Sequence, residues 1–333
     1  MKVQPPSFEI IYGMENLYHA WHKVSIGKSS KSSIMNFYRN LDGNLNLISN
    51  DLKNKSYYPG SYNRFLIKDP KERIICASHV RDRIVQHAIM NFYEPVFDRH
   101  FIYDNYSCRI GKGTHKAVLK AFHFAKNSFY FLKMDVRKYF DSIDHVILKN
   151  LLIEIIKDKD VLSLFYMIIN SYETTHQKGI PIGNLTSQYF ANYYLSAFDH
   201  YFKEQRKVKR YIRYMDDFIV FSDNKNELKD IYAFSVFYLE KMLKIFLKPQ
   251  ILNTVKKGAP FLGFLVKHSG IYMQKKIKKR YRDHIKEIEY KRKNEMYSDI
   301  DAARRIESIT SHLLIARSRN FRNNVLHGRV FGV

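Results

Sequence analysis

The sequence is poor in several residue types, and each shortage excludes a class of protein. Of 333 residues only two are cysteines, Cys76 and Cys108, which excludes a disulfide scaffold and a four-cysteine zinc or iron–sulfur site. The longest uncharged run, residues 179–198, contains Gly, Pro, Asn, Thr, Ser and Gln, so it does not read as a membrane span. Residues 1–10 carry a lysine and two prolines where an export signal would have its apolar centre. We therefore expect a cytoplasmic protein without a membrane segment.

Acidic residues are also in short supply. The chain has 56 Lys and Arg against 32 Asp and Glu, a formal net charge of +24 at pH 7. An excess of this size favours a polyanionic partner such as nucleic acid. Hydrophobic residues make up 45% of the chain and aromatics 15%, which is too much apolar material for a disordered protein. The length allows two or three lobes, and no low-complexity linker or internal repeat separates them.

Hydrophobic periodicity predicts an α+β chain with strands gathered in its centre. The expected helices are 14–58, 80–95, 144–172, 186–205 and 224 to about 246, and the expected strands are 129–136, 211–215 and 218–222. Two short strands are expected within 65–75 and a hairpin within 261–273. The central order is strand, helix, strand, strand, helix, strand, which folds as a split antiparallel sheet backed by helices.

The C-terminal segment is the most basic part of the chain. Residues 275–293 hold ten Lys or Arg against three acids in a helical pattern, and four arginines but no acid follow Glu307. A solvated helix face explains such a run in an average protein. Because the whole chain is basic as well, the run favours a lobe that binds nucleic acid.

Three aspartates stand out in a chain so short of acids. Asp135 ends an apolar strand, and Asp216 and Asp217 lie together at a hairpin tip between two apolar strands. Carboxylates in such surroundings are costly to bury unpaired, and a bound cation would neutralise them. Hard oxygen ligands suit Mg²⁺. If the strands are neighbours, the acids converge on a pair of ions; for an Asp-Asp pair alone, an exposed turn is the alternative.

Tyr214-Met-Asp-Asp217, with Asp135 upstream, resembles the catalytic motif of reverse transcriptases, and further blocks match in the same order from about Phe8 to Leu326. The resemblance implies a right-hand polymerase fold and an RNA-directed DNA polymerase. It also implies two Mg²⁺ ions, replaceable by Mn²⁺, at Asp135, the backbone of Val136, Asp216 and Asp217. It divides the chain into an N-terminal helical extension with fingers, in which palm segments are interleaved (1–128), a palm (129–274) and a basic helical thumb (275–333).

The resemblance assigns contacts to other blocks as well. Residues implied to bind the nucleotide are Lys68, Lys71, Arg73, Arg137, Lys138, Phe140, Ile182, Gly183, Gln188 and Lys248. Residues implied to bind nucleic acid are Arg83, Arg109, Lys112, His115, Lys275, Lys276, Lys279 and Arg280. Phe140 matches the aromatic gate that excludes a 2′-hydroxyl, with an ordinary core phenylalanine as the alternative. Phe261-Leu-Gly263 is similar to the primer grip.

The block Ile182-Gly-Asn-Leu-Thr-Ser-Gln188 departs from the usual pattern, because most reverse transcriptases have Gln at the first position and Pro at the last. This variant resembles the enzymes of diversity-generating retroelements, for which error-prone copying at template adenines is implied. An apolar wall beside the incoming base discriminates poorly between nucleotides. A lineage variant without effect on fidelity is the alternative.

The resemblance also implies partners. These are an RNA template, a DNA or RNA primer, dNTPs, a structured non-coding RNA and a small basic accessory protein. A bacterial or phage reverse transcriptase that serves a retron or antiphage defence is the nearest alternative function. A catalytically inactive RNA-binding scaffold is the alternative from another class.

Overall fold

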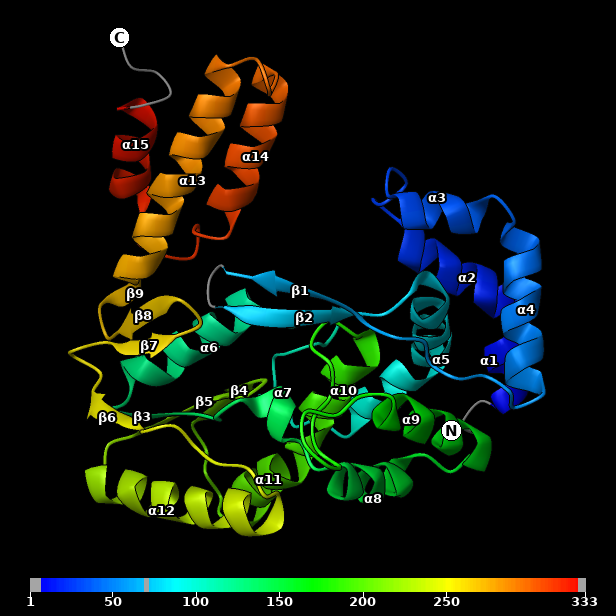
Figure 1. The fold of residues 1–333 in the computed structure, drawn as a ribbon. Coiled ribbons are helices and arrows are strands. Elements are labelled where there is room, and N and C mark those ends of the chain that lie inside the picture. The colour runs from blue at the N-terminus through cyan, green and yellow to red at the C-terminus, as the bar shows by residue number, and fades with distance from the viewer. Residues whose placement is uncertain (1–6, 69–71, 329–333) are drawn as a thin grey trace. The chain divides into compact units, whose positions relative to one another are not determined.

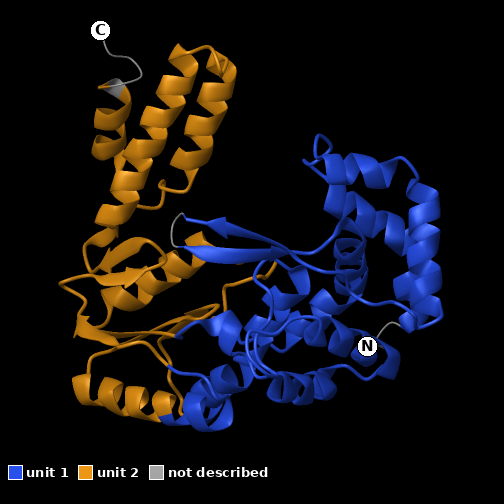
Figure 2. Cartoon of the chain, viewed as in Figure 1, with its two compact units in different colours: residues 1–102, 136–205, 237–246 blue, residues 103–135, 206–236, 247–333 orange. Residues whose placement is uncertain are grey.

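The computed structural model describes residues 7–68 and 72–328. The chain divides into two compact units, coloured separately in Figure 2. Unit 1 comprises residues 1–102, 136–205 and 237–246, and unit 2 comprises residues 103–135, 206–236 and 247–333. Neither unit is a continuous stretch of sequence, so segments far apart in the chain share one core.

Unit 1 is mainly helical (Figure 1). Its helices are α1 Phe8–Tyr12, α2 Met14–Ser25, α3 Ser32–Tyr38, α4 Leu41–Lys53, α5 Val80–Arg99, α7 Tyr139–Ser142, α8 His145–Ile155, α9 Lys159–Asn170, α10 Leu185–Tyr194, α11 Ser196–His200 and a π-helical turn Tyr201–Gln205. The buried ring of Phe97 on α5 contacts the rings of Phe165 and Tyr193, which ties α5 to α9 and α10. The two strands β1 Asn63–Ile67 and β2 Arg73–Ala77 pair antiparallel, as expected from the sequence.

Unit 2 carries the other strands. β3 Tyr130–Asp135, β4 Tyr211–Tyr214, β5 Asp217–Ser222 and β6 Ile251–Thr254 form an antiparallel sheet in the order β4-β5-β3-β6. β7 Ala259–Phe261, β8 Phe264–Lys267 and β9 Gly270–Met273 form a second antiparallel sheet. The helices are α6 Thr114–Lys126, α12 Lys225–Met242, α13 Lys275–Lys293, α14 Asp299–Ser311 and α15 Arg319–His327, and α12 continues into unit 1. This is the predicted α+β class with a split antiparallel sheet.

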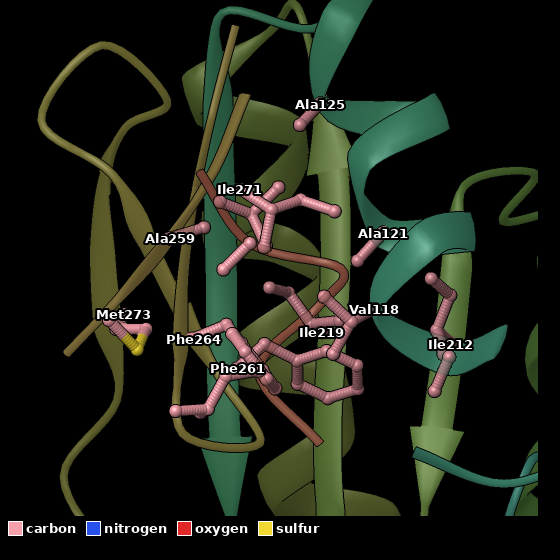
Figure 3. Close-up of a cluster of buried hydrophobic side chains, with 14 of the residues drawn as sticks. Val118, Ala121, Ala125, Ile212, Ile219, Ala259, Phe261, Phe264, Ile271 and Met273 are labelled. Carbon is pink, nitrogen blue, oxygen red and sulfur yellow. The ribbon is translucent and has the colours of Figure 1, made fainter. Parts of the chain in front are cut away.

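The core of unit 2 lies between α6 and the two sheets. Figure 3 shows Val118 and Ala121 of α6 directed toward Ile219 of β5 and Phe264 of β8. Tyr281 of α13 belongs to the same buried cluster, so the basic C-terminal helices share this core. Burial of a large apolar side chain contributes about 1.5–3 kcal/mol. The cluster therefore fixes β3 and β5 against β7–β9, and this arrangement holds the site described below.

Three helical predictions were wrong in detail. The segment expected as helix at 14–58 is three helices, α2, α3 and α4, the last of which ends at Lys53. α5 does not end before Pro95 but runs to Arg99. The proline removes one backbone donor, while the following turn buries Val96 and Phe97, and that burial outweighs the lost hydrogen bond. The single helix expected at 144–172 is two helices, because the side chain of Asp158 accepts hydrogen bonds from the first turn of α9 and starts a new helix there.

The fourth strand of the central sheet also differs from the prediction. It is β6, which the sequence analysis did not predict, and not the 261–273 segment. That segment contributes to a separate three-stranded sheet, with a break where Leu262 and Gly263 both have positive φ. β6 pairs with β3 over four residues from Tyr130 to Lys133.

Candidate active site

The central sheet places two of the three aspartates opposite each other. β3 and β5 are neighbours, and their register pairs Asp135 directly with Asp217. Residues opposite each other in an antiparallel pair project from the same face of the sheet. Asp216 lies next to this pair, in the turn between β4 and β5. The sheet thus brings together the strands that the sequence analysis required to be neighbours.

The turn that carries Asp216 has a strained backbone, which a hydrogen bond from Arg213 stabilises. Tyr214 pairs with Asp217, so only Met215 and Asp216 form the loop, and Met215 has φ 56°. A non-glycine residue in this region costs about 1–3 kcal/mol and persists only where its surroundings impose it. Here the fully buried Arg213 donates from Nη1 to the Met215 carbonyl oxygen at 3.0 Å. Arg213 thus fixes the backbone immediately before Asp216 and Asp217.

Two lysines neutralise the facing carboxylates. Lys248 Nζ lies 2.6 Å from Asp135 Oδ1, and the Lys248 backbone N–H donates to the Asp135 carbonyl oxygen at 2.8 Å. Lys133 Nζ lies 3.2 Å from Asp217 Oδ2. Lys133 precedes Asp135 by two residues on the same strand, so both point to one face of the sheet. Each of the two facing acids therefore has its own lysine: Lys133 of β3 for Asp217, and Lys248, which precedes β6, for Asp135.

Asp217 has the strongest electrostatic signature of the site. Burial is the main cause that raises the pKa of its carboxyl to about 7; the charges of Asp135 and Asp216 act in the same direction, and Lys133 opposes the shift. Its Oδ1 atom is buried and makes no hydrogen bond. A buried carboxylate oxygen without a partner, next to a second carboxylate, is a donor set that suits a hard divalent cation. The residues present therefore fit the metal that the motif implies.

The protein alone does not form a closed metal cage. Within residues 7–68 and 72–328, no group of three or more His, Cys, Asp or Glu side chains is arranged to hold an ion. Mg²⁺ in polymerase sites uses one or two carboxylates together with substrate phosphates. An open arrangement of two facing acids with Asp216 beside them agrees with that mode of binding.

In unit 1, the block around Ile182 lies against β2. The Cys76 backbone N–H of β2 donates to the Ile182 carbonyl oxygen at 2.8 Å. Gly183 has φ 121°, and a Cβ at this position would lie 2.9 Å from Ile75 Cγ2. Glycine is therefore required here, both by the backbone and by the close approach of β2. Ile182 itself is half-buried.

The other residues implied to bind the nucleotide are spread over unit 1. Lys68, Arg73, Arg137, Lys138 and Gln188 are exposed, and Lys71 lies outside the described residues. Lys138 has φ 41°, immediately before α7. Phe140 is half-buried, and its carbonyl oxygen accepts a hydrogen bond from the Ile180 backbone N–H at 2.9 Å.

The residues implied to bind nucleic acid fall into three places. In unit 1, Arg83 is partly buried, its Nε makes no hydrogen bond, and its charge lowers the pKa values of Lys28 and His87 after the larger effect of burial. Arg83 and Lys28 are therefore neighbouring cations in unit 1, whereas the lowered pKa of about 4 leaves His87 uncharged near neutral pH.

In unit 2, two of the candidates have internal partners. Arg109 donates to the Asn105 carbonyl oxygen at 3.1 Å, and His115 Nε2 lies 3.0 Å from the His312 carbonyl oxygen. On α13, Lys275, Lys276 and Lys279 are exposed and Arg280 is half-buried. The acids Glu287 and Glu289 pair with Lys291 and Lys293 at the other end of that helix.

Comparison with known families decides what these motifs belong to. The family model "Reverse transcriptase (RNA-dependent DNA polymerase)" matches residues 67–266, which contain the facing acids, the Met215 turn and the Ile182 block. The chain belongs to the reverse transcriptase family. Members of this family use divalent metal ions, in agreement with the donor set of Asp135 and Asp217.

Curated relatives of this reverse transcriptase include intron-encoded proteins. It is 30% identical over 178 residues to the group II intron-encoded protein LtrA of Lactococcus lactis, a match that covers 49% of this chain and 28% of LtrA. It is 27% identical over 202 residues to the putative COX1/OXI3 intron 2 protein of Saccharomyces cerevisiae, covering 56% of this chain and 23% of that protein. The matched region thus spans about a quarter of these relatives.

Solved structures with a similar fold include telomerases. The match to apo telomerase from Candida tropicalis has a TM-score of 0.52 at 10% identity and covers 84% of this chain and 63% of that one. The match to telomerase from Candida albicans with a TWJ fragment of telomeric RNA has a TM-score of 0.50 at 12% identity, covering 82% and 55%. These likenesses show the right-hand polymerase fold.

No helix within the described residues is long and apolar enough to cross a membrane.

The sequence analysis missed two residues of this site. Lys133 had a visible signal: it is the only charge inside an apolar strand, two residues before Asp135, where the period of a strand places both on one face. Arg213 had a similar signal, a cation within the apolar strand that leads into the turn. Its bond to the Met215 carbonyl could not be foreseen, because it depends on the positive φ of that residue.

Proposed function

We propose that this reverse transcriptase extends a DNA strand on an RNA template, with Asp135, Asp216 and Asp217 as the catalytic carboxylates. The observation that supports this most is the direct pairing of Asp135 with Asp217 on adjacent strands, with an unpartnered buried oxygen on Asp217. We propose Mg²⁺ as the ion, with Mn²⁺ as a substitute. Bound there with the Val136 carbonyl as a further ligand, it would activate the primer hydroxyl and stabilise the leaving pyrophosphate.

The chain's own residues have distinct roles in this proposal. Lys248 keeps Asp135 in place through both its backbone and its side chain, and its ammonium can move to a phosphate once a metal neutralises the carboxylate. Arg213 keeps the Asp216 turn in its strained conformation. Phe140 would lie under the sugar and exclude ribonucleotides. Lys68, Lys71, Arg73, Arg137, Lys138 and Gln188 are proposed nucleotide contacts.

The experiment is primer extension on a defined RNA template with each of Mg²⁺ and Mn²⁺, and with dNTPs or rNTPs. We expect a DNase-sensitive product with dNTPs and little product with rNTPs. Phe140→Ala tests the gate: incorporation of rNTPs should rise while the use of dNTPs is retained. A failure to extend any primer, with RNA binding intact, would contradict the polymerase and favour the scaffold alternative.

We further propose the error-prone mode of diversity-generating retroelements, copying inaccurately at template adenines. The Ile182 block supports this, because its backbone is fixed by Cys76 and the shape of Gly183, leaving an apolar side chain in the place of an amide. Sequencing of the products tests it: errors concentrated opposite adenine are expected. An even and low error rate would favour a retron or defence enzyme of the same fold.

The family resemblance also supports a set of domain boundaries and partners. We propose fingers with the N-terminal extension in 1–128, palm in 129–274 and thumb in 275–333. The residues proposed to bind nucleic acid are Arg83, Arg109, Lys112, His115 and, on α13, Lys275, Lys276, Lys279 and Arg280. A structured non-coding RNA, a small basic accessory protein and a cytoplasmic location rest on the family resemblance and the composition.

A further inference from the structure

A groove lies on the outer side of α6 in unit 2, apart from the facing acids. It has a volume of about 460 Å³ and is lined by the segment that precedes α6 and by the helix itself, including Tyr103, Lys112, Lys116, Leu119, Lys120 and His123. All of these residues belong to unit 2. The groove carries none of the residues that pair with Asp135 or Asp217.

One face of α6 is buried in the core of unit 2, and the opposite face lines the groove. Ala117, Val118, Ala121 and Ala125 are fully buried and pack toward the sheets, as Figure 3 shows for the last three. Lys116, Leu119 and Lys120 follow the opposite side, and the Leu119 side chain is 48% exposed. The helix thus stands between the groove and the strands that carry the acids. A ligand in the groove would not occupy the catalytic site.

The groove is basic and aromatic at once. Lys112 Nζ lies 3.4 Å from the centroid of the Tyr103 ring and donates to the Tyr103 carbonyl at 2.8 Å. Lys116 Nζ donates to the Gly111 carbonyl, and Lys120 Nζ lies over the Phe124 ring at 4.7 Å. Tyr103 is 73% exposed. No acidic residue lines the groove. The contacts of Lys116 and Lys120 are with a carbonyl and a ring, which a phosphate could replace.

The arrangement has the features of a surface for single-stranded nucleic acid. Lys116 and Lys120 are one helical turn apart, about 6 Å along the axis, which is close to the separation of successive phosphates in a strand. An exposed ring beside such a row gives a base a platform for stacking. An acidic peptide would use the lysines but not the exposed face of Tyr103.

We propose that the outer groove of α6 binds a single-stranded part of the template RNA outside the segment being copied. Phosphates would contact Lys112, Lys116 and Lys120, and a base would stack on Tyr103. RNA is the occupant because the DNA product leaves the reaction paired with its template, so only RNA remains single-stranded. This rests on the proposed polymerase function and adds a second RNA site that anchors the template.

The test compares two primed templates in the complete protein: a short hybrid, and the same hybrid with a long single-stranded RNA extension. We expect Lys116→Gln with Lys120→Gln to raise KM for the extended template several-fold and to leave kcat and the short hybrid unchanged. The matched control is Lys225→Gln with Lys229→Gln, two exposed lysines at the same spacing on α12. The control should behave as wild type on both templates.

Two further measurements separate the parts of the proposal. For single-stranded RNA, the slope of log Kd against log salt should fall by about 1.4 in the α6 double variant, since two phosphate contacts are lost. Tyr103→Ala should weaken binding about tenfold, and Tyr103→Phe, which keeps the ring, should restore it. Thermal melting verifies that each variant is folded.

Some results would overturn the proposal. Equal effects of the α6 and α12 double variants, or an unchanged salt slope, would contradict the RNA site and leave an acidic protein as the remaining kind of occupant. Loss of synthesis on the short hybrid would place these lysines in the copying site instead. If wild type fails on both templates, the polymerase function itself fails, which is distinguishable from failure of the groove alone.

Discussion

The acid pair and the α6 groove, both in unit 2, are built on opposite principles. Strand register, a strained turn and one lysine each fix the positions of the Asp135 and Asp217 carboxylates. The lysines of the groove are exposed or held by carbonyls and rings, and they repeat along a helix. Chemistry at the acids should therefore fail on a single substitution, whereas binding at the groove should weaken in steps.

The largest expected effect is at the acids. Asp216→Ala or Asp217→Asn should reduce polymerisation by ~10³-fold or more, because several kcal/mol of charge stabilisation are lost. RNA affinity should stay within about twofold of wild type, since the chain's positive surface is unchanged. Primer extension and fluorescence anisotropy measure the two quantities. Asp230→Asn, an exposed acid on α12, is the control. Synthesis retained in Asp216→Ala would remove that residue from the metal site.

Metal binding at the same acids should depend steeply on pH. Because the pKa of Asp217 is raised to about 7, its carboxyl is protonated below that pH and a metal must displace the proton. Mn²⁺ affinity should therefore fall about tenfold per pH unit below 7 and level off above it, as followed by electron paramagnetic resonance.

Lys133 provides the sharper version of that experiment. Its charge lowers the Asp217 pKa, so Lys133→Met should move the midpoint of the Mn²⁺ profile to higher pH, and Lys133→Arg should keep it near the wild-type value. A midpoint that stays fixed in Lys133→Met would show that the pair does not control the carboxyl.

An intermediate effect is expected at Arg213. Arg213→Met leaves the Met215 carbonyl without its buried donor, which costs about 1–3 kcal/mol of folding stability. The released turn should lower kcat more than it raises KM, because Asp216 moves while the binding surfaces stay. Denaturant unfolding and steady-state kinetics measure the two parts. A variant with lower stability but normal kcat would limit Arg213 to a structural role.

The smallest expected effect is on fidelity. Ile182→Gln restores a polar group at the proposed base-contacting position and should lower errors opposite adenine by on the order of tenfold, with little change in rate. Ile182→Val keeps the apolar wall and is the matched control. Sequencing of extension products decides the matter, and identical error spectra for the two variants would sink the fidelity argument.

The sequence was sufficient for the local parts of the site and insufficient for its cross-strand contacts. Dense apolar runs and the Asp-Asp pair predicted β3 and the β4–β5 turn, because short apolar runs bounded by polar residues are typical of buried strands. β6 escaped prediction because it is only four residues long, exposed at Ile251 and polar at Asn253. The pairs Lys248–Asp135 and Lys133–Asp217 depend on sheet order and register, which no local pattern specifies.

The sequence was likewise insufficient to predict which residues line the α6 groove. The sequence analysis implied a nucleic-acid contact at Lys112 from a motif, yet it gave no reason to join Tyr103, Lys116 and Lys120 to it. Only the helix orientation, set by the buried Val118 and Ala121, brings them to one surface.

The most direct test of the central claim is extension of a labelled DNA primer on a defined RNA template by wild type, Asp135→Asn and Asp230→Asn, side by side. Asp135 is the residue to change because it faces Asp217 across the sheet and also accepts a hydrogen bond from Lys248. We expect full-length DNA from wild type and Asp230→Asn and none from Asp135→Asn, with equal RNA binding by all three. Full-length product from Asp135→Asn would contradict the account.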